Sequence, residues 1–261
     1  MPIEKVHIVE PSHYLRKVQE DALSPFQIPI GWHENAMTLQ SDQAQSSTAA
    51  RWIMLHEVLD ALPIFMFKRA ADGSWQEVLV TLKEGGNDPT FQFCLSPEPT
   101  AASRAFAPPS TYKSDIWEAC PESVSMIRIV ADLLRLSQGG GGALVIDYGG
   151  DQSVMQEGTG SLRGIKDHQF VHPLIEPGEV DLSADVDFGF IKRLLTRETK
   201  LNVEGPTQQA DFLSALGIKE MMRQLHLSEA EKTGAERIID TGESGMGKVY
   251  KVLTLTPKRE E

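Results

Sequence analysis

Three acidic side chains follow three short apolar runs, and these acids are the residues of the chain best placed to do chemistry. They are Glu10 after the run 6–9, Glu57 after the run 52–55, and Asp147 after the run 144–146. Runs of this length and composition predict buried strands, and the carboxyl ends of parallel strands meet at one edge of a sheet. Carboxylates gathered there could orient a basic group and accept its proton. Each acid taken alone could also be an ordinary polar residue where a strand leaves the core.

Glu10 has a second possible role. In nucleotide-binding sheets an acid at the end of the second strand accepts hydrogen bonds from ribose hydroxyls, and the position of Glu10 fits that role. Such an acid is normally preceded by another strand and by a glycine-rich turn that opens a helix. Only nine residues precede Glu10, and they contain no such turn.

Three other segments resemble known binding motifs, but each lacks a feature that phosphate or metal binding requires. Residues 242–249 resemble a phosphate-binding loop but end in Val249, where Ser or Thr is needed to bind magnesium. The glycines at 139–142 precede a predicted strand, so they are read as a helix end and linker. His168 and His172 are four residues apart but lack the glutamate of a zinc-protease helix, and we expect no metal site.

Composition narrows the class of protein further. The 261 residues are 41% hydrophobic, which is typical of a globular protein, and their net charge is −12. An acidic chain is a poor candidate for general binding to phosphate backbones, so no nucleic-acid partner is expected. The two cysteines, Cys94 and Cys120, cannot form a disulfide framework or a four-thiolate zinc site, and they favour a reducing compartment. No apolar run approaches the roughly 20 residues that span a bilayer, and no signal or transit peptide is evident.

Strands and helices alternate through the first half of the chain, which predicts an α/β fold with a parallel sheet and an antiparallel element near the end. Strands are expected at 6–9, 26–32, 52–55, 64–69, 75–82, 91–95, 144–146, 237–240 and 248–256, the last two as an antiparallel pair. Helices are expected at 12–23, 122–136, 185–196, 207–216 and 218–230. Residues 40–50 are expected to form a polar loop, 97–109 a connection rich in Pro and Ala, and 151–185 a long loop without strong periodicity.

Several segments, in order, resemble one family. They are VHIVEPSHYLRKVQ at 6–19, LHEVLDALPIFMF at 55–67, GGALVIDYG at 141–149, GSLRGIKDHQFVHPLIEPGEVDLSADVDF at 160–188, GPTQQADFL at 205–213 and MGKVYKVLTL near the end. On these segments the chain resembles the MidA-type class I S-adenosylmethionine-dependent methyltransferases. The resemblance extends over nearly the whole chain.

This resemblance implies a fold. The family has a class I, Rossmann-like methyltransferase sheet with strand order 3-2-1-4-5-7-6 and with insertions. By resemblance, residues 6–9 correspond to strand 2, 52–55 to strand 4 and 144–146 to strand 5. We therefore expect residues 1–261 to form a single domain, with a hairpin insertion at about 64–95 and a substrate lid at about 151–187. Strand 1 and its glycine-rich loop have no counterpart here, so we expect a gap beside strand 2, an N-terminally truncated sequence and poor binding of the cofactor.

The resemblance also implies a function. The family includes a mitochondrial complex I assembly factor that methylates protein arginine, so the expected reaction is methyl transfer from S-adenosylmethionine to an arginine of a complex I subunit. Glu57, Asp60 and Asp147 are then the expected catalytic residues. Glu10, His56 and Glu57 are the expected cofactor-binding residues, although the family often has Asn where this chain has His56. A mitochondrial location rests on the resemblance alone.

Two alternatives stay open at this point. The chain could be a catalytically inactive binding or assembly protein that has lost the cofactor loop. It could also methylate a small molecule, because class I sheets serve many acceptors. The oligomeric state is not predicted.

Overall fold

The computed structural model describes residues 3–43, 47–83, 90–108, 112–152, 160–243 and 245–258. The helices are α1 (His13–Leu23), the 3-10 helix η1 (Ser24–Phe26), α2 (Ala36–Asp42), α3 (Ala101–Phe106), α4 (Pro121–Arg135), α5 (Phe188–Glu198), α6 (Gln209–Ala215), α7 (Ile218–Gln224), α8 (Glu229–Ile238) and α9 (Met246–Val249). The strands in the first half are β1 (Val6–Val9), β2 (Ile30–His33), β3 (Arg51–His56), β4 (Phe65–Arg69), β5 (Trp75–Leu82), β6 (Phe91–Leu95) and β7 (Ile116–Ala119). Those in the second half are β8 (Gly141–Gly150), β9 (Arg163–Lys166), β10 (Gln169–Val171), β11 (Asp181–Ser183), β12 (Val186–Asp187), β13 (Leu201–Gln208) and β14 (Tyr250–Pro257).

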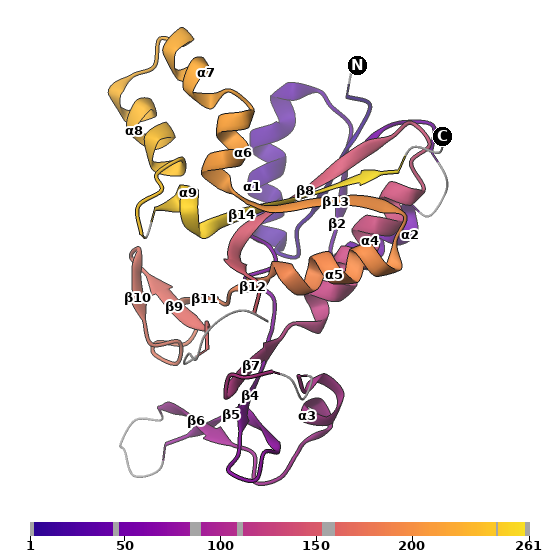
Figure 1. Cartoon of the computed structure of the whole chain (residues 1–261). Helices are drawn as coiled ribbons and strands as arrows, with labels where there is room; N and C mark the ends of the chain where they lie inside the picture. Colours follow the sequence, from indigo (N-terminus) through magenta and orange to yellow (C-terminus); the bar gives the residue numbers. More distant parts are fainter. Residues whose placement is uncertain are drawn as a thin grey trace.

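The main sheet has five strands with β8 at its centre (Figure 1). β3 runs parallel to β8, and the short β12 pairs in parallel with the last two residues of β8. On the other side β14 is antiparallel to β8, and β13 is antiparallel to β14. The predicted α/β fold with an antiparallel element near the end is confirmed.

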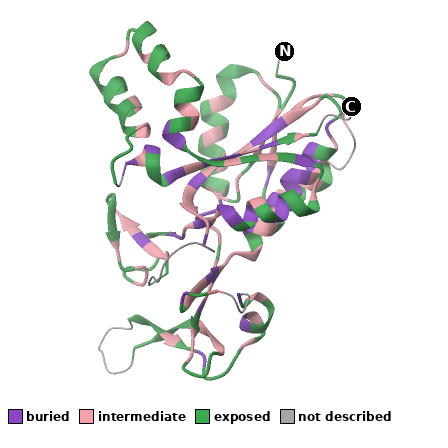
Figure 2. Ribbon diagram, in the orientation of Figure 1, coloured by how far each residue is buried: buried purple, intermediate pink, exposed green. Residues whose placement is uncertain are grey.

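The core lies between this sheet and the helices α4 and α5. α4 begins with Pro121 at its first turn, where a missing amide costs nothing, and it buries one apolar face. Ile127 and Leu134 of that face are fully buried, as is Val145 of β8. Figure 2 shows the buried residues concentrated along β8, α4 and α5. This packing holds β3 and β8 in place, so the residues that end these two parallel strands lie at the same edge of the sheet.

β1 and β2 form a separate two-stranded parallel sheet. After β1, Ser12 caps α1 by accepting a hydrogen bond from the Leu15 amide. Among the described residues no strand pairing joins β1 to β3. The gap expected beside β1 is therefore present.

The predicted hairpin at 64–95 is confirmed and enlarged. β4, β5 and β6 form it, and β7 adds a fourth strand on the far side of β4. The sheet projects from the main body at the bottom of Figure 1. β7 was not predicted, and α3 lies where only a connection was expected, because the short elements 101–106 and 116–119 have too few residues to show a period.

The segment 160–187 is not the irregular loop that was predicted. β9, β10 and β11 form a small antiparallel sheet in the order β10-β9-β11. Its strands are three or four residues long, which is too short for a pattern to stand out. Residues 153–159 of the expected lid, and 44–46 of the expected loop at 40–50, lie outside the described residues.

Several predicted boundaries are wrong, mostly in the last third. The predicted strand at 237–240 contains the end of α8, and β14 pairs instead with β13 and β8. The sequence of β13 hides its strand character because the Gly205-Pro206 pair interrupts it, and a register shift follows Glu204. The predicted helix 207–216 begins only at Gln209, and 218–230 contains α7 and the start of α8. Elsewhere α2 occupies part of the predicted loop, Gly141 and Gly142 belong to β8, and the strand expected at 26–32 begins at Ile30.

Candidate functional site

Glu57 lies where β3 ends, and its backbone has an unusual conformation. Its φ is 51°, in the left-handed region of backbone conformations, which residues other than glycine rarely adopt. The Glu57 amide donates to the Ile146 carbonyl at 3.0 Å, which extends the β3–β8 pairing to this residue. The Glu57 carboxylate accepts a hydrogen bond from the hydroxyl of Tyr250. Strain of this kind is found at functional sites, where the surrounding structure imposes it.

Tyr148 and Tyr250 form the aromatic side of the site. They are register partners in the antiparallel pair β8–β14, and their rings meet edge to face with centroids 4.8 Å apart. Burial and the charges of Asp60 and Glu57 raise the pKa of Tyr148 to about 12. Burial and the hydrogen bond to Glu57 also raise the pKa of Tyr250. Both hydroxyls therefore remain protonated near neutral pH.

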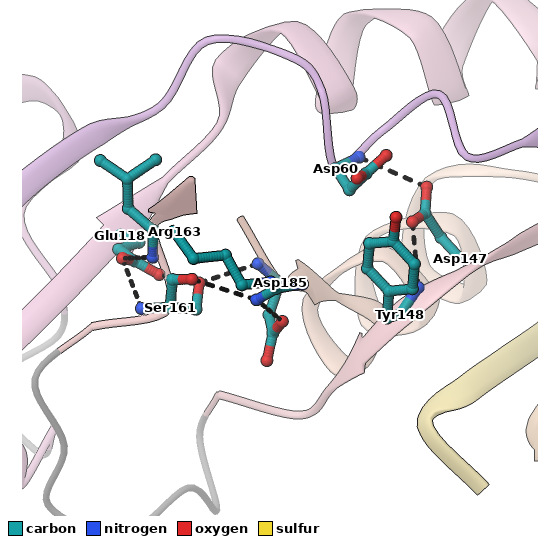
Figure 3. Close-up of polar contacts among 8 residues, drawn as sticks. Asp60, Glu118, Asp147, Tyr148, Ser161, Arg163 and Asp185 are labelled. Atoms are coloured by element: carbon teal, nitrogen blue, oxygen red, sulfur yellow. Dashed lines mark hydrogen bonds and ion pairs between the residues drawn. The ribbon is translucent and has the colours of Figure 1, made fainter. Parts of the chain in front are cut away.

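Asp147, at the same end of β8, organises the turn that follows β3 (Figure 3). One carboxylate oxygen accepts the amides of Leu59 at 3.0 Å and Asp60 at 3.3 Å, and the other accepts the amide of Tyr148 at 2.9 Å. Asp147 is only 1% exposed. Burial, and secondarily the charge of Asp60, raise the pKa of Asp147 to about 7. Its contacts are those of a residue that positions the site.

Asp60 is buried beside Asp147, and one of its carboxylate oxygens has no hydrogen-bond partner among the described residues. Its backbone carbonyl accepts the amide of Ala184 at 3.0 Å, which ties this turn to the segment 160–187. A buried acceptor without a partner is costly unless a donor reaches it. Asp60 therefore retains an acceptor that a donor group could use.

A guanidinium group already lies against this cluster. The Cζ atom of Arg163, on β9, is 5.3 Å from the ring centroid of Tyr148 and 5.8 Å from that of Phe170. Its Nη1 atom pairs with Asp185 Oδ1 at 2.6 Å. The aromatic surface beside the acids is thus compatible with a stacked guanidinium.

Glu118, on β7 of the insertion, holds the segment 160–187 in place. Its carboxylate accepts hydrogen bonds from the Ser161 amide at 2.8 Å, the Leu162 amide at 3.1 Å and the Ser161 hydroxyl. The Ser161 hydroxyl in turn accepts the amide of Asp185 at 2.8 Å. Figure 3 shows this network leading from Glu118 toward Arg163 and Tyr148.

The remaining predicted site residues lie to the side of this cluster. The His56 side chain is exposed, its Nε2 atom is 4.0 Å from Glu57 Oε1, and its ring is 6.5 Å from that of Tyr250. Glu10 is at the end of β1 as predicted, but its carboxylate accepts from the Ser12 amide at 2.8 Å and from the Gln19 side chain at 3.2 Å. Glu10 thus contacts the start of α1 rather than the acids beyond β3.

The fit of an S-adenosylmethionine cofactor was tested on the surroundings of Glu10. Each Glu10 oxygen accepts one hydrogen bond, and a carboxylate oxygen can accept two. Beside it, Gln19 Oε1 and Arg16 Nε are buried without a hydrogen-bond partner. The Gln19 oxygen can accept and the Arg16 N–H can donate a hydrogen bond beside a partly buried acid, and a ribose hydroxyl can do both, so the described residues fit the sugar part of the cofactor.

Glu57, Asp60 and Asp147 were expected from the sequence, and the structure places all three at the ends of β3 and β8. The sequence did not single out Tyr148, Tyr250 or Arg163. Tyr148 directly follows Asp147 and could have been noticed. Tyr250 could not, because its place depends on the register of β14 against β8. Asp187 caps α5 by accepting the Phe190 amide at 2.9 Å.

Three further features concern the described part of the chain. It contains no group of three or more His, Cys, Asp or Glu side chains arranged to hold a metal ion. Both cysteines are free thiols. None of the helices there is long and apolar enough to cross a membrane.

A family model described as a putative S-adenosyl-L-methionine-dependent methyltransferase matches residues 3–207, well over half of the chain. The chain belongs to this family. The resemblance to methyltransferases predicted from the sequence is therefore confirmed, and with it the class of cofactor that the family uses.

Individual relatives agree with this assignment. The chain is 34% identical over 213 residues to the Caenorhabditis elegans protein arginine methyltransferase NDUFAF7 homolog, mitochondrial, with 79% of this chain and 47% of the relative covered. It is 30% identical to human protein arginine methyltransferase NDUFAF7, mitochondrial, with 84% and 50% covered. The chain thus spans about half the length of these curated relatives.

A solved structure confirms the fold of this family member. A likely methyl transferase from Burkholderia thailandensis, bound to S-adenosyl-homocysteine, matches with a TM-score of 0.74 at 23% identity, over 97% of this chain and 64% of the other. At this identity the match supports the predicted α/β methyltransferase fold and not a shared substrate.

Proposed function

We propose that this chain carries the acceptor site of a mitochondrial protein arginine N-methyltransferase, which transfers methyl groups from S-adenosylmethionine to an arginine of a complex I subunit and so supports complex I assembly. The observation that carries the proposal is the guanidinium of Arg163 over the ring of Tyr148, a tyrosine whose pKa is raised by burial and by the charges of Asp60 and Glu57. This contact supports the proposal, because an aromatic ring near carboxylates suits an arginine side chain. The names of the curated relatives support the reaction and the location.

In this proposal Glu57 is the residue that handles the acceptor. A carboxylate can bind a guanidinium through two parallel hydrogen bonds, offset its charge and take the proton that nitrogen loses as the new N–C bond forms. Tyr250 holds the carboxylate in place through its hydroxyl. Tyr148 offers its ring face to the planar guanidinium. Asp60, with its free acceptor oxygen, would bind a second N–H of the substrate.

Glu10, His56 and Glu57 are the residues that would hold the cofactor. When bound, S-adenosylmethionine supplies a methyl group on a positively charged sulfur, and loss of that methyl leaves a neutral thioether. The cofactor would thus supply the methyl carbon to which the acceptor nitrogen bonds. Glu57 then carries the displaced proton away from the nitrogen.

We further propose that residues 1–261 act as one domain in which the segment 160–187 covers the acceptor site. The contacts of Glu118 with Ser161 and of Ala184 with Asp60 support this arrangement. They join the insertion, the covering segment and the turn after β3 into one connected structure.

The test is methyl transfer by the purified chain to arginine peptides from complex I subunits, read by mass spectrometry, together with calorimetric titration of S-adenosylmethionine. Glu57→Gln keeps the shape of the side chain but removes its charge, and we expect it to lower kcat by about 100-fold or more. Glu98→Gln, at an exposed acid of the insertion, is the matched control and should leave the rate unchanged. Equal rates for wild type and Glu57→Gln would contradict the proposal.

A binding or assembly protein without activity is the second candidate. It is favoured by the separation of β1 from β3, because no strand pairing among the described residues joins the strand that precedes Glu10 to the strand that precedes Glu57. In that case the arginine peptides would bind in calorimetry, but no methyl group would be transferred and no cofactor binding would be detected. Transfer that depends on Glu57 would exclude this candidate.

A further inference from the structure

Arg163 lies at the place that the proposed function gives to the substrate arginine. Its Cζ atom is over the ring of Tyr148, 5.3 Å from the centroid, and its side chain is only 22% exposed. The same ring meets that of Tyr250 edge to face, with an angle of 76° between the two planes. A second guanidinium that approaches Tyr148 therefore meets a ring that residues of this chain already contact.

The guanidinium of Arg163 is held by few contacts. Its Nη1 atom donates to the Ser161 carbonyl at 3.1 Å and to Asp185 Oδ1 at 2.6 Å (Figure 3). A guanidinium has five N–H donors, and none of the hydrogen bonds among the described residues uses those on Nε or Nη2. The ring of Phe170, itself 78% exposed, lies 5.8 Å from Cζ. Arg163 is thus bound through one nitrogen and through two aromatic rings.

The small sheet that carries Arg163 is loosely joined to the rest of the chain. In the part of the chain that the structure describes, no hydrogen bond joins residues 163–183 to any residue outside the covering segment. Two ring contacts lie across this boundary, that of Arg163 with Tyr148 and that of His172 with Phe93, whose ring centroids are 5.8 Å apart. The small sheet can therefore move outward without breaking a hydrogen bond to the main sheet or to the insertion.

We infer that Arg163 is an internal competitor of the substrate, which occupies the acceptor site until the small sheet moves outward and takes the Arg163 guanidinium off the Tyr148 ring. Since the site is the one proposed above to bind the acceptor, this role rests on the proposed function. Only the open state binds an arginine side chain, so the apparent affinity falls with the fraction of molecules that are closed. The competitor thus sets how tightly a substrate must bind to open the site.

A purely structural role of Arg163 predicts the opposite effect of its removal. If the guanidinium only clamped the covering segment, its loss would loosen the site and weaken binding of an arginine ligand. If it competes with the ligand, its loss leaves the site vacant and strengthens binding. The sign of the change therefore separates the two roles.

The test is calorimetric titration of the purified chain with the peptide acetyl-Gly-Arg-Gly-amide. Arg163→Met removes the guanidinium but keeps an unbranched apolar stem, and we expect it to tighten binding of the peptide by about tenfold or more. Arg197→Met is the matched control, because Arg197 on α5 is 78% exposed and pairs with Glu198 at 3.1 Å. This control should bind the peptide as wild type does.

Asp185→Asn tests the same role without changing Arg163. It removes the charge that holds Nη1 but keeps an oxygen that can accept a hydrogen bond, so the guanidinium should leave the ring more readily. We expect the peptide to bind about threefold more tightly than to wild type. If Arg163→Met folds poorly, Asp185→Asn and the measurement on wild type that follows still decide.

A second readout follows Arg163 itself by NMR. The Nε–H resonance of Arg163 is sensitive to the ring beside it, and Tyr148→Leu gives its value without that ring. We expect the resonance in wild type to move toward this value as acetyl-Gly-Arg-Gly-amide saturates the site. A structural clamp would keep its position when the peptide binds.

Equal or weaker binding of the peptide to Arg163→Met, or an Arg163 resonance that does not respond to saturating peptide, would overturn the inference. Failure of the proposed reaction gives a different result. Tighter binding to Arg163→Met without any methyl transfer would support the competitor and contradict the reaction. Transfer that depends on Glu57, with equal binding to wild type and Arg163→Met, would support the reaction and contradict the competitor.

Discussion

The carboxylate of Asp147 accepts the backbone amide of Asp60 at 3.3 Å, so one of the predicted catalytic acids positions the other. The two acids lie 87 residues apart in the chain and meet because β3 and β8 end at the same edge of the sheet. Asp147 also accepts the amides of Leu59 and Tyr148. The site is therefore built on a buried acid that does not itself face solvent.

Removal of the Asp147 carboxylate should destabilise the fold. Asp147→Ala leaves the buried amides of Leu59, Asp60 and Tyr148 without acceptors, and we expect the free energy of unfolding to fall by about 2–4 kcal/mol. Asp147→Asn retains an acceptor oxygen, so its free energy of unfolding should fall by less than that of Asp147→Ala. Urea unfolding of both variants measures the difference. Equal losses would show that packing, and not hydrogen bonding, explains the effect.

Asp147 should also make stability depend on pH. Its pKa is about 7 in the folded chain against an ordinary value of 3.8, so the native state holds a proton that the unfolded state has released. The contribution of this group is therefore most favourable below about pH 4 and is lost as pH rises toward 7. The slope is at most about 1.4 kcal/mol per pH unit. The free energies of unfolding of wild type and Asp147→Asn are measured by urea unfolding from pH 4 to pH 8. We expect their difference to show this slope. A difference that does not change with pH would contradict the raised pKa of Asp147.

The left-handed backbone at Glu57 predicts that the glycine variant at this position is more stable than the alanine variant, which is the reverse of the usual order. Glycine adopts φ values near 51° without a steric penalty, whereas alanine does not. Both Glu57→Gly and Glu57→Ala remove the contact with Tyr250, so their difference isolates the backbone. We expect the glycine variant to be more stable by about 1 kcal/mol in thermal or urea unfolding. Greater stability of the alanine variant would mean that the backbone relaxes at this position.

Loss of the Glu118 carboxylate should loosen the segment 160–187. Hydrogen bonds to a charged acceptor are among the stronger ones, and Glu118 accepts three from Ser161 and Leu162. We expect Glu118→Ala to speed amide exchange at Ser161 and Leu162 by about tenfold or more. Glu98→Gln on the same insertion should leave exchange unchanged. If Glu118→Ala had no effect, β11 rather than Glu118 would hold this segment.

The sequence was sufficient to predict the architecture that depends on local patterns. Apolar runs at β1, β3 and β8 and the helical period of α4 are strong signals, and each is confirmed. Short elements such as β7 and β9 were missed because three or four residues do not establish a period. β13 was missed because Gly205-Pro206 breaks its pattern on an edge strand, where proline is tolerated.

The sequence alone also determined which residue types stand at the strand ends, and so which acids could take part in chemistry. Only the tertiary structure decided their roles, because burial and hydrogen-bond partners are properties of packing between distant segments. Packing buried Asp147 beneath the turn that holds Asp60, paired Glu57 with Tyr250 across the sheet, and turned Glu10 toward α1. The separation of β1 from β3 likewise depends on where two strands lie relative to each other, which no local pattern of residues specifies.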